Sequence, residues 1–166
     1  AEVAVENGAN TFYYTPAGDT SVVTLETTQS TLGGFRYRIL ARGVAGSLSS
    51  TNTIPDRVPV ETHAKLLAIH ESNNFELLDI YVVDAGESID EVPPRRAALN
   101  AGIPAPTIRL ATGSFDMYVT EFGEKVVLAG PYRLDVTVGD VVDAVIVDTV
   151  DPAMLDVLFL SGGPVL

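Results

Sequence analysis

Hydrophobic and polar residues alternate most regularly in residues 115–128, and this alternation predicts a β-hairpin. Phe115, Met117 and Val119 fall on one face of an extended chain, with polar or amphipathic residues between them. A period of two is typical of a half-buried strand. The EFGE segment that follows supplies a turn, because Gly123 can adopt a positive φ without steric cost. β-branched residues then resume the extended pattern.

Other short apolar segments, bounded by turn-forming residues, predict that the rest of the fold is also β-structure. The strands expected besides the hairpin are 65–71, 78–84, 107–110, 132–138, 141–148 and 155–160. The segment 141–148 is apolar on both faces, so we expect it in the middle of a sheet. Residues 85–106 contain Pro93, Pro94, Pro104 and Pro106 and are predicted to form a long loop, in which residues 95–101 form at most one helical turn.

The first part of the chain aligns with a later part when it is shifted by 105 residues. The aligned identities are turn glycines and residues of the hairpin: Gly8 with Gly113, Tyr13 with Tyr118, Thr15 with Thr120, Gly18 with Gly123, Val22 with Val127, and Gly34 with Gly139. We interpret residues 1–60 as the C-terminal half of one module and residues 64–163 as a complete second module. The predicted fold is all-β: tandem immunoglobulin-like antiparallel β-sandwiches, with the first module only partly represented.

The alignment leaves residues 64–105 of the second module without a counterpart in the first. The residues expected to line the core of the first module are Val3, Val5, Phe12, Tyr14, Val23, Phe35, Tyr37 and Ile39. Without the missing strands, some of them would face water, beside unpaired strand edges. We expect protein outside residues 1–166 to complete this module, either an upstream part of the same chain or a strand from a neighbouring subunit.

Composition and charge restrict the partners. Of 166 residues, 46% are hydrophobic and 19% charged, which is typical of a folded protein. The net charge of −12 argues against nucleic acid as a partner, because such a surface repels phosphates. The apolar segments are too short to cross a bilayer, so we expect no membrane insertion. With no cysteine, the chain has no disulfides or thiolate metal sites.

Several segments of the second module resemble a known family. They are Leu66–Ser72 (LLAIHES), Leu78–Val82 (LDIYV), Gly113–Thr120 (GSFDMYVT) with Gly123, and Thr137–Asp140 (TVGD) before an apolar strand. Their order resembles the bacterial extracellular domain-of-unknown-function family numbered 4397, in which Asp79 and Tyr81 match a D-x-Y pattern. The resemblance implies an exported, surface-associated sandwich module and supplies no catalytic residues.

Few residues suggest catalysis or metal binding. The two histidines are His63 and His70, and Ser114 lies in a turn that lacks the strand-to-helix elbow of a nucleophile. We interpret His70 as a hydrogen-bonding residue that holds the turn after its strand. We therefore predict no catalytic, cofactor-binding or metal-binding residues, and we predict that the protein is not an enzyme.

Two groups of carboxylates could in principle bind calcium, which needs six to eight converging oxygen ligands. One group flanks an apolar strand and the other occupies a loop: Asp140, Asp143, Asp148 and Asp151, and Asp84, Glu87, Asp90 and Glu91. Neither group has the spacing of an EF-hand loop. We interpret both as solvated acidic surface that keeps the protein soluble.

The leading prediction for function is a non-catalytic structural or binding module in an extracellular, adhesive or filament-forming protein. Its partners would be other copies or neighbouring modules, and Arg36, Arg38 and Arg42, alternating along one strand, could contact such a neighbour. The alternative is a carbohydrate-binding or enzyme-accessory module. An exposed aromatic row would indicate that alternative, and the candidates for it are Tyr118, Phe122 and Tyr132.

Overall fold

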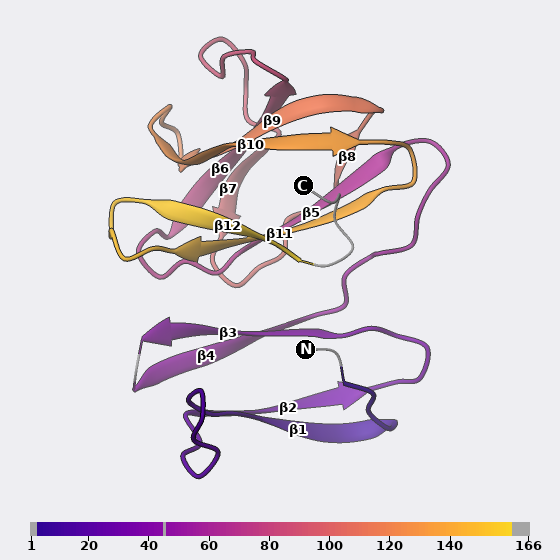
Figure 1. Cartoon of the computed structure of the whole chain (residues 1–166), viewed down its shortest axis with the longest axis vertical. Coiled ribbons are helices and arrows are strands. Elements are labelled where there is room, and N and C mark those ends of the chain that lie inside the picture. Colours follow the sequence, from indigo (N-terminus) through magenta and orange to yellow (C-terminus); the bar gives the residue numbers. More distant parts are fainter. Residues whose placement is uncertain (1–2, 45, 161–166) are drawn as a thin grey trace. The chain divides into compact units, whose positions relative to one another are not determined.

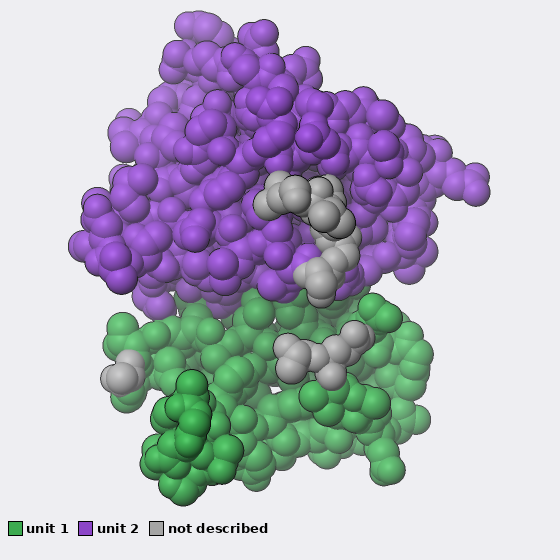
Figure 2. Space-filling model, viewed as in Figure 1, with its two compact units in different colours: residues 1–55 green, residues 56–166 purple. Residues whose placement is uncertain are grey.

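The structure is a computed structural model that describes residues 3–44 and 46–160. These residues form twelve β-strands and no helix (Figure 1), so the predicted all-β class is confirmed. They include no helix long and apolar enough to span a membrane. The chain divides into two compact units, residues 1–55 and residues 56–166 (Figure 2). The predicted module limits at residues 1 and 163 lie outside the described residues.

The second unit contains two four-stranded sheets, an arrangement consistent with a β-sandwich. The strand order is β10-β9-β6-β7 in one sheet and β12-β11-β5-β8 in the other. The strands are β5 (Ala64–His70), β6 (Leu77–Asp84), β7 (Arg96–Asn100), β8 (Ile108–Leu110), β9 (Gly113–Glu121), β10 (Val127–Val136), β11 (Val141–Asp148) and β12 (Leu155–Leu160).

The two sheets of the second unit share one hydrophobic core. Met117 and Val119 from β9, and Val142 and Ile146 from β11, belong to this core and are fully buried. Burying one such side chain contributes about 1.5–3 kcal/mol. The alternation that predicts these strands is thus the alternation between core and outer face.

The predicted central hairpin is confirmed as β9 and β10, which pair antiparallel. Gly123 has a φ of +79°, and the amide of Glu124 donates to the carbonyl of Glu121 at 3.1 Å, which closes the turn. The segment 141–148 is also a strand in the middle of a sheet, since β11 lies between β12 and β5. Its apolar residues on both faces suit that position.

The prediction for residues 95–101 is wrong, because they form the edge strand β7 and not a helical turn. β7 pairs antiparallel with β6, and the pairing contains an irregularity opposite Leu78 and Ile80. Ala98 there has a φ of +53°, and its amide donates to the carboxylate of Asp79 at 2.8 Å. The backbone conformation of β7 is therefore set by its pairing with β6 and by the hydrogen bond from Ala98 to Asp79.

Two further expectations need correction. The expected strand 132–138 is not separate, because β10 runs from Val127 through an irregularity to Val136. The sheets are also not wholly antiparallel, because β5 and β11 pair in parallel, with Lys65 beside Val141 and His70 beside Ile146. The remaining pairs between strands of this unit are antiparallel.

The first unit consists of two antiparallel hairpins. β1 (Gly8–Tyr14) pairs with β2 (Leu25–Thr31), and β3 (Arg38–Val44) pairs with β4 (Ser47–Thr53). They form two separate two-stranded sheets, where the second unit has four strands in each sheet. The hydroxyl of Ser50 on β4 donates to that of Thr27 on β2 at 2.8 Å, so the two hairpins touch.

The first hairpin of this unit has the register of the β9–β10 hairpin. Gly8 lies opposite Thr31, and a shift of 105 residues turns this pair into Gly113 and Val136, which also lie opposite each other. The next four pairs agree in the same way, as far as Phe12 with Thr27 and Met117 with Tyr132. The sequence alignment at a shift of 105 residues thus agrees with the backbone pairing of these five residue pairs.

Burial is the clearest difference between the units. Among the described residues of the first unit, Thr31 and Thr51 are buried and no apolar side chain is. Three residues expected to line its core face solvent: Val3 is 71% exposed, Phe35 57% and Val23 51%. The expectation that some of these residues face water is confirmed.

The irregular part of β10 gives a test of close backbone packing. A Cβ at Gly130 would lie 2.6 Å from the carbonyl oxygen of Met117, and the residue has a φ of +112°. Gly86 also has a positive φ (+87°), but there is open space around it. We expect Gly86→Ala to cost about 1–2 kcal/mol, the cost of the left-handed conformation. We expect Gly130→Ala to cost about 3 kcal/mol or more, because the clash adds to the strain.

Thermal unfolding followed by circular dichroism measures both variants. Equal melting temperatures would contradict the close approach of β10 to β9.

Candidate functional site

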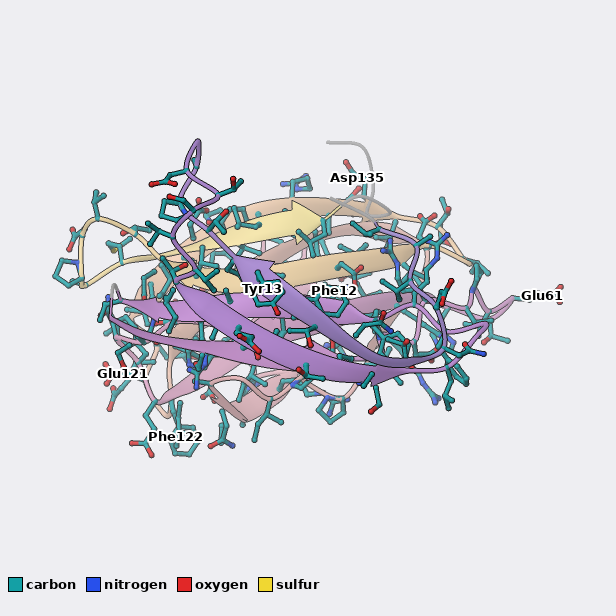
Figure 3. The ribbon with its side chains drawn as sticks, turned by 90° about the horizontal axis from the view of Figure 1, so that it is seen from below. Phe12, Tyr13, Glu61, Glu121, Phe122 and Asp135 are labelled. Atoms are coloured by element: carbon teal, nitrogen blue, oxygen red, sulfur yellow. The ribbon has the colours of Figure 1, made fainter. Side chains whose placement is uncertain are left out.

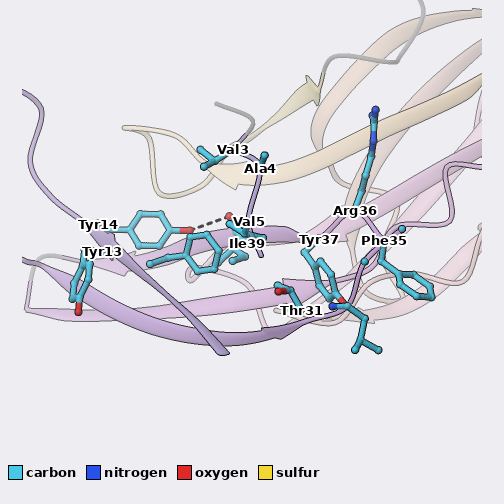
Figure 4. A pocket seen from close by; sticks show the side chains of 14 residues that line it. Val3, Ala4, Val5, Tyr13, Tyr14, Thr31, Phe35, Arg36, Tyr37 and Ile39 are labelled. Atoms are coloured by element: carbon cyan, nitrogen blue, oxygen red, sulfur yellow. Dashed lines mark hydrogen bonds between the residues drawn. The ribbon is translucent and has the colours of Figure 1, made fainter. Parts of the chain in front are cut away.

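A hollow of about 750 Å³ lies within the first unit, between its two hairpins (Figure 4). Its walls come from the chain before β1, from β1 itself, from the segment between β2 and β3, and from β3. Aromatic and aliphatic side chains dominate these walls, among them Phe12, Tyr14, Phe35, Tyr37 and Ile39. Apolar character and concave shape are the usual features of a binding site.

Two tyrosines of the hollow are fixed by their hydroxyl groups. Tyr14 on β1 donates to the main-chain carbonyl of Ile39 on β3 at 2.9 Å (Figure 4), and partial burial raises the pKa of Tyr14 above its ordinary value. The hydroxyl of Tyr37 accepts a hydrogen bond from the amide of Leu32 at 2.9 Å. Both rings are therefore held at the wall while their faces remain available for contact.

The side chains that line the hollow are of types that suit ligand binding. Its ionisable lining residues are tyrosines and Arg36, and no carboxylate or histidine belongs to the lining that is described. A general acid or base needs a group that exchanges a proton near neutral pH, usually histidine or a carboxylate. The hollow instead offers aromatic faces, aliphatic side chains and one cation.

The structure places the histidines and Ser114 in local hydrogen bonds. Nδ1 of the buried His70 accepts from the amide of Ser72 at 3.1 Å, so Nε2 carries the proton that is donated to the carbonyl of Phe75 at 2.9 Å. His70 thus holds the turn after β5, as predicted. Ser114 donates to Asp135 at 2.5 Å, and His63 bonds the neighbouring Thr62 at 2.8 Å. The three residues are not brought together.

Three of the carboxylates considered for calcium, Asp90, Asp140 and Asp151, accept hydrogen bonds within their own turns. Asp140 accepts from the amide and the hydroxyl of Thr137, at 2.6 and 3.0 Å. Asp143 is fully buried on β11, with an oxygen 3.3 Å from a guanidinium nitrogen of Arg57. Asp90 accepts from Ser88. Within residues 3–44 and 46–160, no three His, Asp or Glu side chains converge as a metal site would require.

Asp148 links the end of β11 to the turn between β5 and β6. Its carboxylate accepts from the hydroxyl of Ser72, from the amide and side chain of Asn73 at 2.9 and 3.1 Å, and from the amide of Asn74 at 3.4 Å. Partial burial acts to raise the pKa of Asp148, but these hydrogen bonds outweigh it and lower the pKa below its ordinary value.

The three candidate aromatic residues do not form one exposed row. Phe122 projects from the hairpin turn (Figure 3) and is 48% exposed. Tyr118 is partly buried against the small cluster of Tyr81, Val83 and Ile89. Tyr132 packs against the main core, on the other side of its sheet from that cluster, with its ring edge-on to Phe159.

The hydroxyl of Tyr132 joins the two sheets of the second unit. It donates to a carboxylate oxygen of Asp156 on β12 at 2.6 Å and accepts from the amide of Val157 at 3.2 Å. Burial and the nearby Asp156 charge raise the pKa of Tyr132 to about 12. Tyr132 therefore has a structural role, because it connects β10 with β12.

Sequence reasoning missed two aspartates that brace the second unit. Asp79 on β6 accepts from the amides of Ala98 and Gly123, at 2.8 and 3.1 Å. Asp116 on β9 accepts from the amide of Gly86 and from Arg133, both at 2.7 Å, and these bonds lower its pKa. The available signal is that both are polar residues inside otherwise apolar strands.

No family model matches the chain, and no curated protein matches it.

The acidic groups lead to a prediction about metal removal. A ligand that binds only the folded state at a hundred times its Kd stabilises that state by about 2.7 kcal/mol. Because no three His, Asp or Glu side chains converge among the described residues, we expect excess chelator to leave the melting temperature unchanged. A fall of several degrees that added calcium reverses would contradict this.

The Asp148 contacts lead to a prediction about pH. A depressed pKa in the folded state means that the carboxylate stabilises the protein above its unfolded-state pKa of about 3.9. This stabilisation is lost as the pH falls through the folded-state value. We expect Asp148→Asn to lower the free energy of unfolding at pH 7 by about 1–3 kcal/mol, a typical range for hydrogen bonds to a charged group.

Urea unfolding at pH 7 and at pH 3 measures the change, and the deficit should shrink at pH 3. Asp151→Asn is the matched control, since Asp151 accepts only a local bond from Ala153 within its own turn. A deficit for Asp148→Asn that is independent of pH would show that the carboxylate charge plays no part.

Proposed function

We propose that this chain is a non-catalytic structural or binding segment of an extracellular or cell-surface protein, built from tandem immunoglobulin-like β-sandwich modules. The observation that carries the proposal is the register shared by five consecutive pairs of the β1–β2 and β9–β10 hairpins under a shift of 105 residues. Consecutive copies of one unit are typical of proteins that extend a binding or adhesive surface. The segments that resemble family 4397 agree with this, since they belong to the strands and turns of the second unit.

The term immunoglobulin-like refers here to the sandwich architecture and not to the order of strands. A constant-type immunoglobulin domain places its first two strands side by side in one sheet. In the second unit, β5 lies between β11 and β8, and β6 lies in the other sheet. Sandwich domains share an architecture without always sharing a topology.

The partners proposed for such a segment are neighbouring modules or further copies of the chain. The net charge of −12 makes nucleic acid an unfavourable partner. Arg36, Arg38 and Arg42 remain the cationic residues proposed to meet an acidic neighbour. Arg38 and Arg42 lie on β3, and Arg36 lies just before it.

Carbohydrate binding is the second candidate, and one observation favours it. Phe12, Tyr13, Tyr14, Phe35 and Tyr37 all line the hollow of the first unit. Tyr13 and Phe35 are more than half exposed there. Aromatic rings offer large rigid surfaces for stacking, and tyrosine adds a polar group. Binding to a glycan array that Tyr13→Ala and Phe35→Ala abolish would favour this candidate.

Treating intact cells with protease tests the proposed location. Cells that produce the native protein are digested briefly, and the released peptides are identified by mass spectrometry. We expect peptides from the exposed turns of this chain while a cytosolic marker protein remains intact. Recovery of these peptides only after lysis, together with the marker, would contradict an extracellular location.

A further inference from the structure

The apolar face of the first unit corresponds to a covered face in the second unit. A shift of 105 residues places Phe12 and Tyr14 of β1 on Met117 and Val119 of β9, which are fully buried. The same shift places Tyr37, Ile39 and Ala41 on Val142, Ala144 and Ile146, which are also fully buried. None of the five residues in the first unit is buried.

The second unit also shows what covers this face. There, β6 pairs antiparallel with β9, on the edge opposite to β10. β5 pairs in parallel with β11, on the edge opposite to β12. The inward side chains of these two strands are small or branched and apolar: Ala64, Leu66 and Ala68 on β5, and Leu78, Ile80 and Val82 on β6.

The corresponding edges of the first unit have no strand beside them. β1 has β2 as its single neighbour and β3 has β4, among the strands that the structure describes. The hollow lies between β1 and β3, and exposed apolar residues such as Leu32 (65%) and Phe35 (57%) lie at its rim. Unpaired edges beside an apolar face form a template for strand addition.

We propose that the first unit binds an extended polypeptide that adds one strand antiparallel to β1 and one strand parallel to β3, as β6 and β5 do in the second unit. The occupant is a protein segment with alternating apolar residues joined by a short turn. Main-chain hydrogen bonds to the two edges supply affinity, and the hollow selects the inward side chains.

The parallel arrangement beside β3 distinguishes this occupant from a second copy of the chain. A two-fold axis perpendicular to the sheet, which keeps both apolar faces on the same side, would place β3 antiparallel to its own copy. The β5–β11 pair in the second unit is parallel. The strand arrangement therefore favours a donated segment over symmetric dimerisation.

Size also limits the inward side chains of the occupant. Phe12, Tyr14 and Tyr37 are larger than Met117, Val119 and Val142, which occupy the corresponding positions in the second unit. The hollow of the first unit therefore leaves less room for the added strands at these positions. Small residues such as the alanines of β5 fit best there, because overpacking forces side chains into strained conformations.

A synthetic peptide of residues 64–84, labelled with a fluorophore, is the probe. It carries β5, its turn and β6, and its binding to the 166-residue chain is measured by fluorescence anisotropy. We expect saturable binding that weakens at least tenfold when Leu66 and Ile80 of the peptide are both replaced by aspartate. This control leaves the folding of the protein untouched.

Matched protein variants identify the surface used. Phe12 faces the hollow, whereas Thr11 beside it is exposed and bonds Thr28 across the hairpin. We expect Phe12→Asp to weaken peptide binding at least tenfold and Thr11→Asp to change it less than twofold. Circular dichroism shows whether each variant keeps its strands.

Three outcomes would overturn the proposal. The first is the absence of saturable binding, and the second is binding that the aspartate peptide retains. The third is a dimer of the chain without peptide, seen by light scattering and lost in Phe12→Asp, because a second copy would then be the occupant. The proposal concerns the first unit alone, so none of these outcomes bears on the extracellular location tested by protease.

Discussion

The second unit depends on the burial of one apolar sheet face against another. A β-sheet with one apolar face is stable in water only when a second layer covers that face. Residues at alternate positions of β9 and β11 supply the two layers, and the buried Met117 and Val142 are examples. The bracing aspartates, the closed turns and the Tyr132 link act at the periphery of this core, where they hold strands and turns to one another. In the first unit, each hairpin forms a two-stranded sheet among the strands that the structure describes.

Sequence analysis predicted the elements whose conformation is determined by residues close to one another in the sequence. The β9–β10 hairpin and β11 follow from alternation, β-branched residues and turn glycines, all of which lie within a few positions. Strand β7 was missed because its conformation depends on Asp79, which is nineteen residues away from Ala98. The parallel pairing of β5 with β11 was missed for the same reason, since no residue close to either strand specifies the direction of its neighbour.

The candidate site was predictable only in outline. Its apolar residues follow from alternation, and their exposure follows from the alignment that leaves residues 64–105 without counterparts. The bond between Tyr14 and the Ile39 carbonyl joins different hairpins, so no periodicity within one strand predicts it. Carboxylates were the hardest to interpret, because the sequence alone does not distinguish the role of Asp148, at the end of β11, from that of Asp79, within β6. Their roles emerge from which backbone amides the fold brings within reach.

The parallel pairing of β5 with β11 has a consequence for synthesis. Lys65 of β5 pairs with Val141 of β11. The ribosome therefore makes all the intervening residues after β5 before the strand that pairs with it is complete. At about 5–20 residues per second, this delay is roughly 4–15 seconds. During that time, β8 can pair with one edge of β5, but the edge that pairs with β11 stays open. Because an unpaired strand edge is a template for association, this edge is open to other chains until β11, the seventh strand of the unit, leaves the ribosome.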